Sequence, residues 1–422
     1  MSAKVTSLRA PDELTTRVVN LVRAGQATTR RELMRVTGLG RTAVEDRVDQ
    51  AILAGILADD EYAGSTGGRP SRRLRFRGDR GRIHAVDIGG AHISMAITDL
   101  SSRVLGRRTV ASDLRIGPEA TLTVVRDSLA SLAAELGDPR DPWAVVVGFP
   151  GPVDADRRRS LTSALDMPGW LEFDIPGWFA GYTAVPVWVE NDLNLLARQV
   201  WEHSPQDADH SDMFLVKVSN GIGMAMLSGG RVHRGRFGRA GGIGHSVVVT
   251  GENAAPCICG QTGCLETVAA GWGLVRDATE AARDGQTRAL SARLAEAGRL
   301  TVQDVIEGAR EFDPVSVALL QRSASKLGEA LANFATGFDP GIVYLCGVLP
   351  DVGDYYQATV RRALLQRSFQ ASATSVKVLH HPIAADEGVS AAAGLALQEL
   401  FRADDSALWF ERATTAAPTS AA

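Results

Sequence analysis

The sequence is poor in cysteine, in aromatic residues and in long hydrophobic runs. Only four cysteines occur among 422 residues, and aromatic side chains make up 6% of the chain. So few cysteines cannot form the disulfide framework of a small secreted domain. No segment reaches the roughly 18 apolar residues of a membrane span, and residues 1–17 contain no apolar signal core. We therefore expect a cytoplasmic protein that binds no membrane.

What the chain does have is length and an uneven distribution of charge. At 422 residues, with 45% hydrophobic side chains, it is too long for one ordinary core, which predicts two or three domains. The net charge is −4, yet residues 1–82 carry 16 Lys and Arg against 10 Asp and Glu. The remainder is therefore acidic. A basic amino-terminal unit of this kind suits a polyanionic partner.

The basic unit shows the pattern of three short amphipathic helices. Thr29 and Glu32 have the spacing of a capping box, and Val44, Val48 and Leu53 should face a core. Short helices joined by a turn that contains glycine form a helix-turn-helix. The predicted helices cover residues 11–25, 29–38 and 41–54.

A β-hairpin should follow, because residues 56–77 alternate in polarity around a Gly/Ser tip, and seven arginines lie between Arg69 and Arg82. Together these parts predict a winged helix-turn-helix that binds a double-stranded DNA operator. The third helix would read the major groove, and a Gly-Arg-Pro segment would enter the minor groove. Alternatively, the arginines form a solvated face, or the three helices bind a protein. The expected DNA contacts are Arg41, Thr42, Arg47, Gly68, Arg69 and Pro70.

Beyond residue 82, apolar strands alternate with helices, and glycine or polar residues gather where the strands end. This order predicts an α/β fold of two lobes, each with its own sheet. We expect the last residues to be disordered after Glu411. The expected domains are a DNA-binding domain at 1–82, a two-lobed domain at 83–402 and a carboxyl-terminal tail at 403–422.

Three of the four cysteines cluster in sequence, a short distance after a histidine. One imidazole and three thiolates are the ligands that a structural zinc ion prefers, and a closed set of four leaves no position for a reactive water. Gly260 and Gly263 would allow the tight turns that such ligation requires. The alternative is a set of unligated or redox-active cysteines. The expected ligands are His245, Cys257, Cys259 and Cys264.

The order of six motifs closely resembles the ROK family of repressors, open reading frames and sugar kinases. A winged unit that ends in Gly-Arg-Pro is similar to the repressor branch of that family. The resemblance implies an actin-like, ribonuclease-H-like pair of α/β lobes with a sugar in the cleft between them. The motifs are DIGG (87–90), GFPGPVD (148–154), ENDLN (190–194), SNGIG (219–223), GGIGH (241–245) and CICGQTGCLE (257–266).

The same resemblance implies a set of sugar-binding residues, together with the four zinc ligands already named. Asp192 would be the general base if the chain acted as a kinase, and His245 would reach a sugar hydroxyl from the metal loop. Alternatively, Asp192 caps the helix that follows it. The implied sugar-site residues are Pro150, Gly151, Asn191, Asp192, His245 and Glu266.

Several positions depart from the pattern of the family's kinases. Ala91 replaces a threonine, residues 219–220 (Ser-Asn) replace a Gly-Thr pair, and Val348 replaces a glycine. These changes fall in the three loops that would hold ATP, so we expect no ATP binding. Gly242 replaces a glutamate, which removes a charge-assisted sugar contact of about 1.5–3 kcal/mol. Asp166, where relatives often show asparagine, would alter the choice of sugar or restore part of that acidity.

These observations predict a sugar-responsive transcriptional regulator, a repressor of genes for carbohydrate uptake or catabolism. Its degenerate kinase cleft would sense a sugar or sugar phosphate. A two-fold operator requires paired heads, which predicts a homodimer or homotetramer. One alternative is an ATP-dependent sugar kinase with an appended DNA-binding domain. A third possibility is a DNA-bound regulator whose cleft binds a partner protein instead of a sugar.

Overall fold

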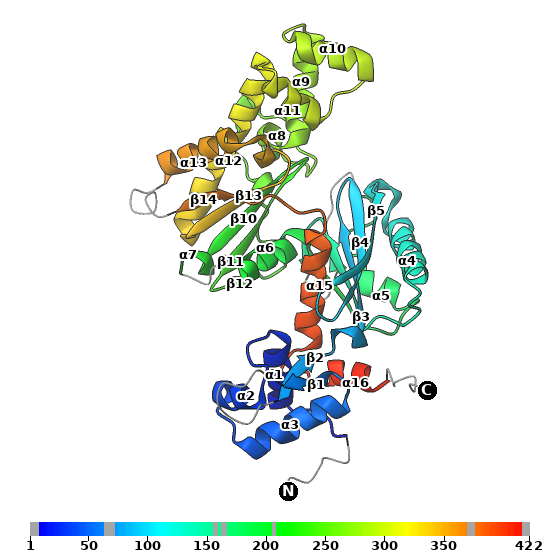
Figure 1. Cartoon of the computed structure of the whole chain (residues 1–422). Coiled ribbons are helices and arrows are strands. Elements are labelled where there is room, and N and C mark those ends of the chain that lie inside the picture. The colour runs from blue at the N-terminus through cyan, green and yellow to red at the C-terminus, as the bar shows by residue number, and fades with distance from the viewer. Residues whose placement is uncertain are drawn as a thin grey trace.

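The fold was analysed in a computed structural model that describes residues 8–62, 72–154, 159–161, 167–204, 208–368 and 376–415. A small amino-terminal head lies beside two larger lobes, and each lobe is built on a five-stranded sheet (Figure 1). The fold is therefore α/β, as predicted, and both large sheets mix parallel and antiparallel strands. Within the described residues, no helix is both long and apolar enough to cross a membrane.

The head contains three helices and a two-stranded hairpin. The predicted capping box is confirmed: the backbone N–H of Glu32 donates to Thr29 Oγ1, and the Thr29 N–H donates back to the Glu32 carboxylate. Val44 and Val48 are fully buried, but Leu53 is 50% exposed. Leu53 was wrongly expected in the core, because it is the last residue of its helix. The elements are α1 (Glu13–Arg23), α2 (Arg30–Thr37), α3 (Arg41–Leu53), β1 (Leu57–Tyr62) and β2 (Arg72–Phe76).

The first lobe has the strand order β5-β4-β3-β6-β9. Neighbours among β3, β4 and β5 are antiparallel, whereas β6 runs parallel to β3 and β9 runs parallel to β6. Because β3, β6 and β9 are parallel, their carboxyl ends meet at one edge of the sheet. The elements are β3 (Arg82–Ile88), β4 (His92–Asp99), β5 (Val104–Ala111), α4 (Pro118–Glu135), β6 (Ala144–Phe149), β7 (Val153–Asp154), β8 (Arg159–Ser160), α5 (Ile175–Phe179) and β9 (Val187–Asn191).

The second lobe repeats this topology, since its strand order β12-β11-β10-β13-β14 matches that of the first lobe strand for strand. Its helices pack around a separate buried core. The elements are α7 (Ala208–Ser211), β10 (Met213–Val218), β11 (Ile222–Ser228), β12 (Arg231–Val232), α8 (Glu266–Ala269), α9 (Gly271–Arg283), α10 (Arg288–Ala297), α11 (Val302–Arg310), α12 (Pro314–Phe338), β13 (Ile342–Cys346), α13 (Asp354–Arg367) and β14 (Lys377–His380).

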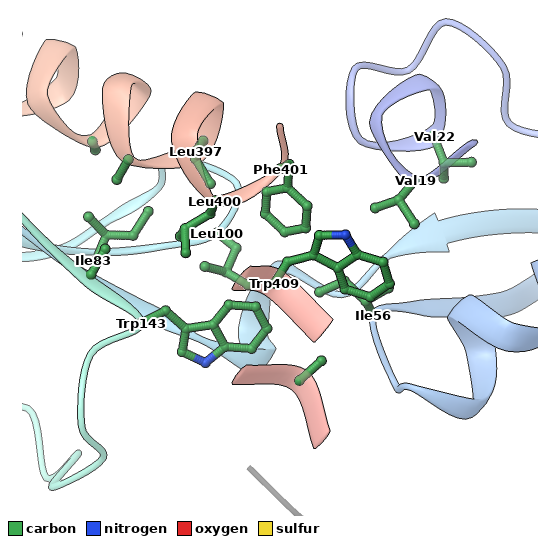
Figure 2. Packing of buried hydrophobic residues seen from close by; sticks show 14 of the residues in the cluster. Val19, Val22, Ile56, Ile83, Leu100, Trp143, Leu397, Leu400, Phe401 and Trp409 are labelled. Atoms are coloured by element: carbon green, nitrogen blue, oxygen red, sulfur yellow. The ribbon is translucent and has the colours of Figure 1, made fainter. Parts of the chain in front are cut away.

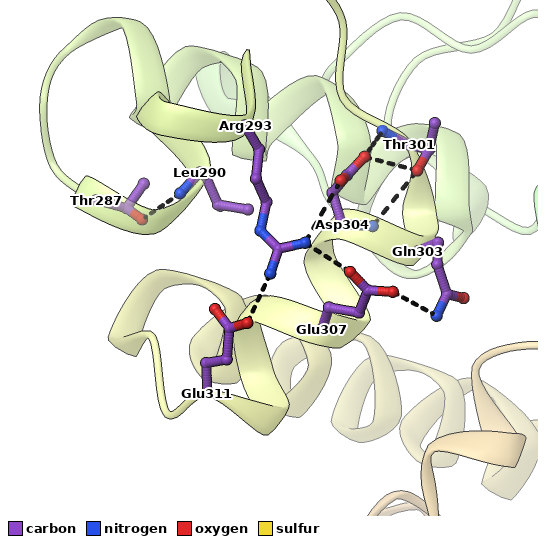
Figure 3. Close-up of polar contacts among 8 residues, drawn as sticks. All are labelled: Thr287, Leu290, Arg293, Thr301, Gln303, Asp304, Glu307 and Glu311. Carbon is purple, nitrogen blue, oxygen red and sulfur yellow. Dashed lines mark hydrogen bonds and ion pairs between the residues drawn. The ribbon is translucent and has the colours of Figure 1, made fainter. Parts of the chain in front are cut away.

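At the far end of the second lobe, one arginine contacts three carboxylates of the neighbouring helical segment. Arg293 on α10 contacts the Glu307 carboxylate at 2.6 Å and the Glu311 carboxylate at 2.8 Å, and lies 3.7 Å from Asp304 (Figure 3). Thr301 and Asp304 also form a capping box at the start of α11. These contacts fix α10 against α11.

Two helices lie between the lobes, and a third follows them at the end of the chain. In Figure 1, α15 runs from between the two lobes down to the head, where α16 also lies. One cluster of buried hydrophobic residues joins the head, the first sheet, α15 and α16. The expected boundary at residue 82 therefore falls inside a shared core. The helices are α6 (Asp192–His203), α15 (Glu387–Leu400) and α16 (Ala407–Thr415).

Helix α16 corrects our expectation of disorder after Glu411. Trp409 is almost fully buried beside Phe401, between the head and the first lobe (Figure 2). Its indole Nε1 donates to Thr16 Oγ1 on α1 at 3.0 Å. The helix continues to Thr415 because its apolar face completes the core of the head; residues 416–422 lie outside the described part of the chain.

Candidate functional site

The expected metal ligands converge on one point in the second lobe. Cys257 Sγ lies 3.7 Å from His245 Nδ1, and Cys259 Sγ lies 3.7 Å from Cys264 Sγ. All four ligand atoms lie within 4.8 Å of one another. A tetrahedral zinc ion, with bonds of about 2.1 Å to nitrogen and 2.3 Å to sulfur, holds its ligand atoms roughly 3.6–3.8 Å apart. The four side chains therefore fit a single tetrahedral ion.

The loop backbone brings these ligands together. Gly260 and Gly263 have φ angles of 88° and 72°, so the two tight turns expected at these glycines are present. A Cβ atom at Gly263 would collide with the carbonyl oxygen of Val249. An antiparallel bridge between Val247 and Cys264 holds the end of the loop against the segment that follows His245. The sequence thus builds the ligand arrangement from its own backbone.

Glu266 follows the metal loop and is buried at the start of α8. Its Oε1 accepts a hydrogen bond from the Ile222 N–H at 2.8 Å, and its Oε2 accepts one from Trp272 Nε1 at 3.2 Å. The carboxylate therefore fastens the metal loop to the start of β11. Each oxygen keeps a second lone pair for a further hydrogen bond.

A second polar group lies at the carboxyl edge of the first sheet. Asn191 Nδ2 donates to the Gly151 carbonyl at 2.9 Å, and Asn191 Oδ1 accepts from the Asn194 N–H at 3.0 Å. Asn191 is therefore the N-cap of α6, and Asp192 is the first residue inside the helix. The alternative in which Asp192 serves as the cap is wrong, because the neighbouring amide fills that role. The Asp192 carboxylate is left for other contacts.

Asp192 is paired with a lysine from the second lobe. Lys217 Nζ on β10 lies 3.2 Å from Asp192 Oδ2. The Asp192 charge raises the pKa of Lys217 against the opposing effect of burial, and the charge of Asp87 adds to this rise. Burial, followed by the charge of Asp192, raises the pKa of Asp87 to about 6. The charge of one ammonium group thus acts on two carboxylates.

A second ion pair involves Glu190, which lies two residues before Asp192 in the sequence. Arg234 contacts the Glu190 carboxylate at 2.6 Å, and Glu190 also accepts a hydrogen bond from Asn194 Nδ2. Neither Lys217 nor Arg234 was predicted as a site residue. The available signal was a lysine in the middle of the apolar strand Phe-Leu-Val-Lys-Val, since a charged side chain there needs a buried partner.

The structure brings together some of the predicted sugar-site residues. Gly151, Asn191 and Asp192 form one connected group, whereas His245 and Glu266 belong to the metal-loop group. Among the described residues, no hydrogen bond or ion pair joins these two groups. Pro150 directly precedes Gly151 at the end of β6. Asp166 lies outside the described residues.

The structure shows the contacts of three positions that depart from the kinase pattern: Ser219, Gly242 and Val348. Ser219 Oγ accepts a hydrogen bond from the Val348 N–H at 3.3 Å, so the loops that follow β10 and β13 are tied together. A Cβ atom at Gly242 would meet only the carbonyl oxygen of Arg239, at 3.8 Å. Among the described residues, a Cβ atom therefore fits at position 242.

The expected DNA contacts fall into different environments. The side chain of Arg41 is 81% exposed and pairs with Glu45 on the same helix, and Thr42 is also exposed. The side chain of Arg47 is only 17% exposed, and its guanidinium contacts the Asp12 carboxylate at 2.6 Å. Arg47 thus holds α3 to the start of α1. Gly68, Arg69 and Pro70 lie outside the described residues.

Comparison with known proteins agrees with this architecture. A sequence model of the ROK family matches residues 83–399. A glucokinase of Halalkalibacterium halodurans is 30% identical over 271 residues, which cover 64% of this chain and 81% of that protein. A putative xylose repressor of Caldicellulosiruptor sp. is 25% identical over 369 residues, covering 83% of this chain and 86% of that protein. The second match covers a larger share of the chain than residues 83–399 do.

A solved structure extends the comparison to nearly the whole fold. The crystal structure of a ROK family transcriptional regulator, described as a homologue of the E. coli MLC protein, superposes with a TM-score of 0.76 at 20% identity. The superposition covers 95% of this chain and 99% of that one. The head and both lobes therefore occur together in a known fold.

Proposed function

Because this chain belongs to the ROK family, we propose that it is a sugar-responsive DNA-binding regulator that represses genes for carbohydrate uptake or catabolism. The observation that carries this proposal is the helix-turn-helix head, which shares one buried core with the ROK body through α15 and α16. The xylose repressor and the MLC-like regulator, whose matches cover most of the chain, support it.

The proposed DNA-binding surface is the start of α3. Arg41 and Thr42 are exposed there, and the N-cap residue Gly40 supplies no side-chain hydrogen bond to the helix. Such a helix start has backbone N–H groups and positive partial charge to offer a phosphate. The segment Gly68–Pro70 remains a predicted minor-groove contact. A two-fold operator would then be bound by a homodimer or homotetramer.

The proposed effector is a sugar or sugar phosphate held by Asn191, Asp192, His245 and Glu266. A structural zinc ion fits the site formed by His245 and the three cysteines, where it would fix the imidazole in place. Since His245 directs Nδ1 toward Cys257, its Nε2 remains as the donor for a sugar hydroxyl. Asp192 would act as a hydroxyl acceptor. We propose no role for ATP.

Electrophoretic mobility shift tests this function. The purified protein would be used to select fragments from a genomic library, and the selected duplex would be titrated with and without a panel of sugars and sugar phosphates. We expect a retarded band whose midpoint shifts with one effector. Failure to retard any selected duplex, even at low ionic strength where phosphate contacts are strongest, would refute DNA binding. A band that no small molecule shifts would favour a protein partner in the cleft.

A sugar kinase is the second candidate, and the match to a glucokinase favours it. Asp192 is present as the possible general base, yet its carboxylate is paired with Lys217. The lysine thus occupies an oxygen that a kinase would need for its substrate hydroxyl. Coupled detection of ADP over the same sugar panel separates the two functions. ADP release that stops in an Asp192→Asn variant would establish the kinase.

A further inference from the structure

A notch of about 260 Å³ lies at the end of α6 that is farther from Asp192. It is bounded by the last turns of α6, by Tyr344 on β13, by His381 after β14 and by Glu387, the first residue of α15. The notch therefore touches both helices that lie between the lobes. Its lining residues are Gln199, Val200, His203, Ser204, Tyr344, His381 and Glu387.

The notch is separate from the candidate sugar site. Asp192 is the first residue of α6, and His203 is the last. At about 1.5 Å per residue, 11 residues of helix separate these two positions by roughly 16 Å. A ligand in the notch would therefore leave the Asp192 carboxylate untouched.

The hydrogen bonds of the two imidazoles determine what the notch offers a ligand. His203 Nδ1 lies 2.8 Å from the Gln199 carbonyl oxygen, which can only accept, so Nδ1 carries the proton and the neutral ring accepts at Nε2. His381 Nε2 lies 2.7 Å from Glu387 Oε1 and donates to it, so this neutral ring accepts at Nδ1. In its neutral form, each ring therefore keeps one nitrogen lone pair for a further contact.

The notch also contains a negative charge. Although burial raises it, the pKa of Glu387 lies below its ordinary value, because the His381 side chain and the Ala384 N–H donate to the carboxylate. Glu387 is therefore ionised at neutral pH. Glu387 is the one acidic side chain among the residues that line the notch. Tyr344 adds an aromatic ring, which can attract a cation through its face.

We propose that this notch is a second small-molecule site, distinct from the sugar site, that takes a compact hydrogen-bond donor bearing a primary ammonium group. Two imidazole lone pairs and a carboxylate would accept hydrogen bonds from its ammonium and hydroxyl groups. The volume holds about nine water molecules at about 30 Å³ each, which suits a ligand the size of an amino sugar. Its occupant would contact the first turn of α15, the helix that continues to the head.

Calorimetric titration of the full chain with D-glucosamine tests the proposal, with D-glucose as the neutral counterpart. An Asp192→Ala background removes the sugar-site carboxylate. We expect glucosamine, but not glucose, to bind this background. Gln199→Lys places a competing ammonium group in the notch, and Glu387→Gln removes its charge; each should raise the Kd for glucosamine at least tenfold. Gln303→Lys on α11, an exposed position far from the notch, should leave the Kd unchanged.

Two outcomes would overturn the proposal. If glucosamine binding disappeared in Asp192→Ala but kept its Kd in Gln199→Lys, this ligand would belong to the sugar site. Absence of binding at millimolar glucosamine would leave the notch without its predicted ligand. Retention of operator DNA and its response to neutral sugars are separate measurements, so the proposed function can fail or hold independently of this site.

Discussion

Lys217 on β10 and Asp192 on α6 form an ion pair, with 3.2 Å between Nζ and Oδ2. The lysine is on the first strand of the second sheet, and the aspartate starts the helix that follows the last strand of the first sheet. The carboxylate that a kinase would use as its base is thus engaged before any ligand arrives. A sugar that hydrogen-bonds to Asp192 must compete with this lysine or share the carboxylate with it.

Asp87 should make stability depend on pH. Its pKa is raised to about 6 from an ordinary value of 3.8, so the folded state prefers the protonated form. The resulting contribution to the free energy of unfolding is fully present below pH 3.8 and is lost as the pH rises through 6. Asp87→Asn should therefore be more stable than the parent at pH 8, by up to about 3 kcal/mol, and the difference should vanish near pH 4. Urea denaturation across this range measures it.

A matched control for Asp87 is available in Asp113. Its exposed carboxylate is bound by Arg115, which lowers its pKa, so Asp113→Asn should show a change of the opposite sign or none at neutral pH. Lys217→Met should move the Asp87 transition to higher pH, because the lysine charge opposes the rise. If the stability difference between Asp87→Asn and the parent did not change from pH 4 to pH 8, the raised pKa of Asp87 would be contradicted.

The head should depend on a residue at the other end of the chain. Trp409→Ala removes a fully buried indole and its hydrogen bond to Thr16, which should cost about 3–5 kcal/mol of unfolding free energy. Chemical denaturation checks the loss, and weaker retention of operator DNA should accompany it. Glu411→Ala, at an exposed position of the same helix, should leave both measurements unchanged.

Two arginines of α3 should behave differently. Arg41→Ala should weaken operator binding by about 1–3 kcal/mol if it contacts a base, without a change in stability. Arg47→Ala should instead destabilise the head, because it breaks the contact with Asp12. Parallel measurements of DNA retention and thermal unfolding separate the two effects. Equal losses of stability in both variants would show that Arg41 is structural as well.

A glutamate at position 242 should strengthen sugar binding. Among the described residues, a Cβ added at position 242 meets one carbonyl oxygen, at 3.8 Å, so the backbone there should tolerate Gly242→Glu. A restored charge-assisted contact of about 1.5–3 kcal/mol should tighten sugar binding at least tenfold. Calorimetry with the effector sugar checks the gain, and Gly242→Gln controls for size. Unchanged affinity in both variants would place the sugar away from this residue.

Metal removal should affect sugar binding more than DNA binding. Cys264→Ser should lower the metal content measured by mass spectrometry and weaken the sugar-dependent thermal shift, because His245 loses the ion that orients it. Cys346→Ala should retain the metal, since Cys346 lies outside the cluster. A metal-free Cys264→Ser protein with unaltered sugar binding would separate the metal from the sensing site.

Local patterns predicted much of this molecule. The capping box of Thr29 and Glu32 and the turns at Gly260 and Gly263 follow from short-range chemistry, and all are present. The proximity of His245 to its three cysteines was also predictable, because one imidazole and three thiolates are a typical ligand set of structural zinc. The roles of the sugar-contact and DNA-contact residues remain predictions.

What the sequence could not provide was pairing over long distances. Lys217 meets Asp192 because α6 packs on the second sheet, and no local pattern reports which partner a strand lysine will find. Arg47 resembles a DNA contact in sequence, but the fold places Asp12 beside it. Trp409 lies in a segment that resembles a tail, and it is ordered because the head supplies the other half of its core.

This last arrangement has a consequence for synthesis on the ribosome. The head emerges first, yet Trp409 follows its partner Thr16 by 393 residues. At about 5–20 residues per second, the wait amounts to roughly 20–80 seconds. During that time the apolar surface of α1 lacks its final cover. The nascent head therefore obtains this cover only after both lobes have been synthesised, so products truncated before Trp409 would carry an unfinished head.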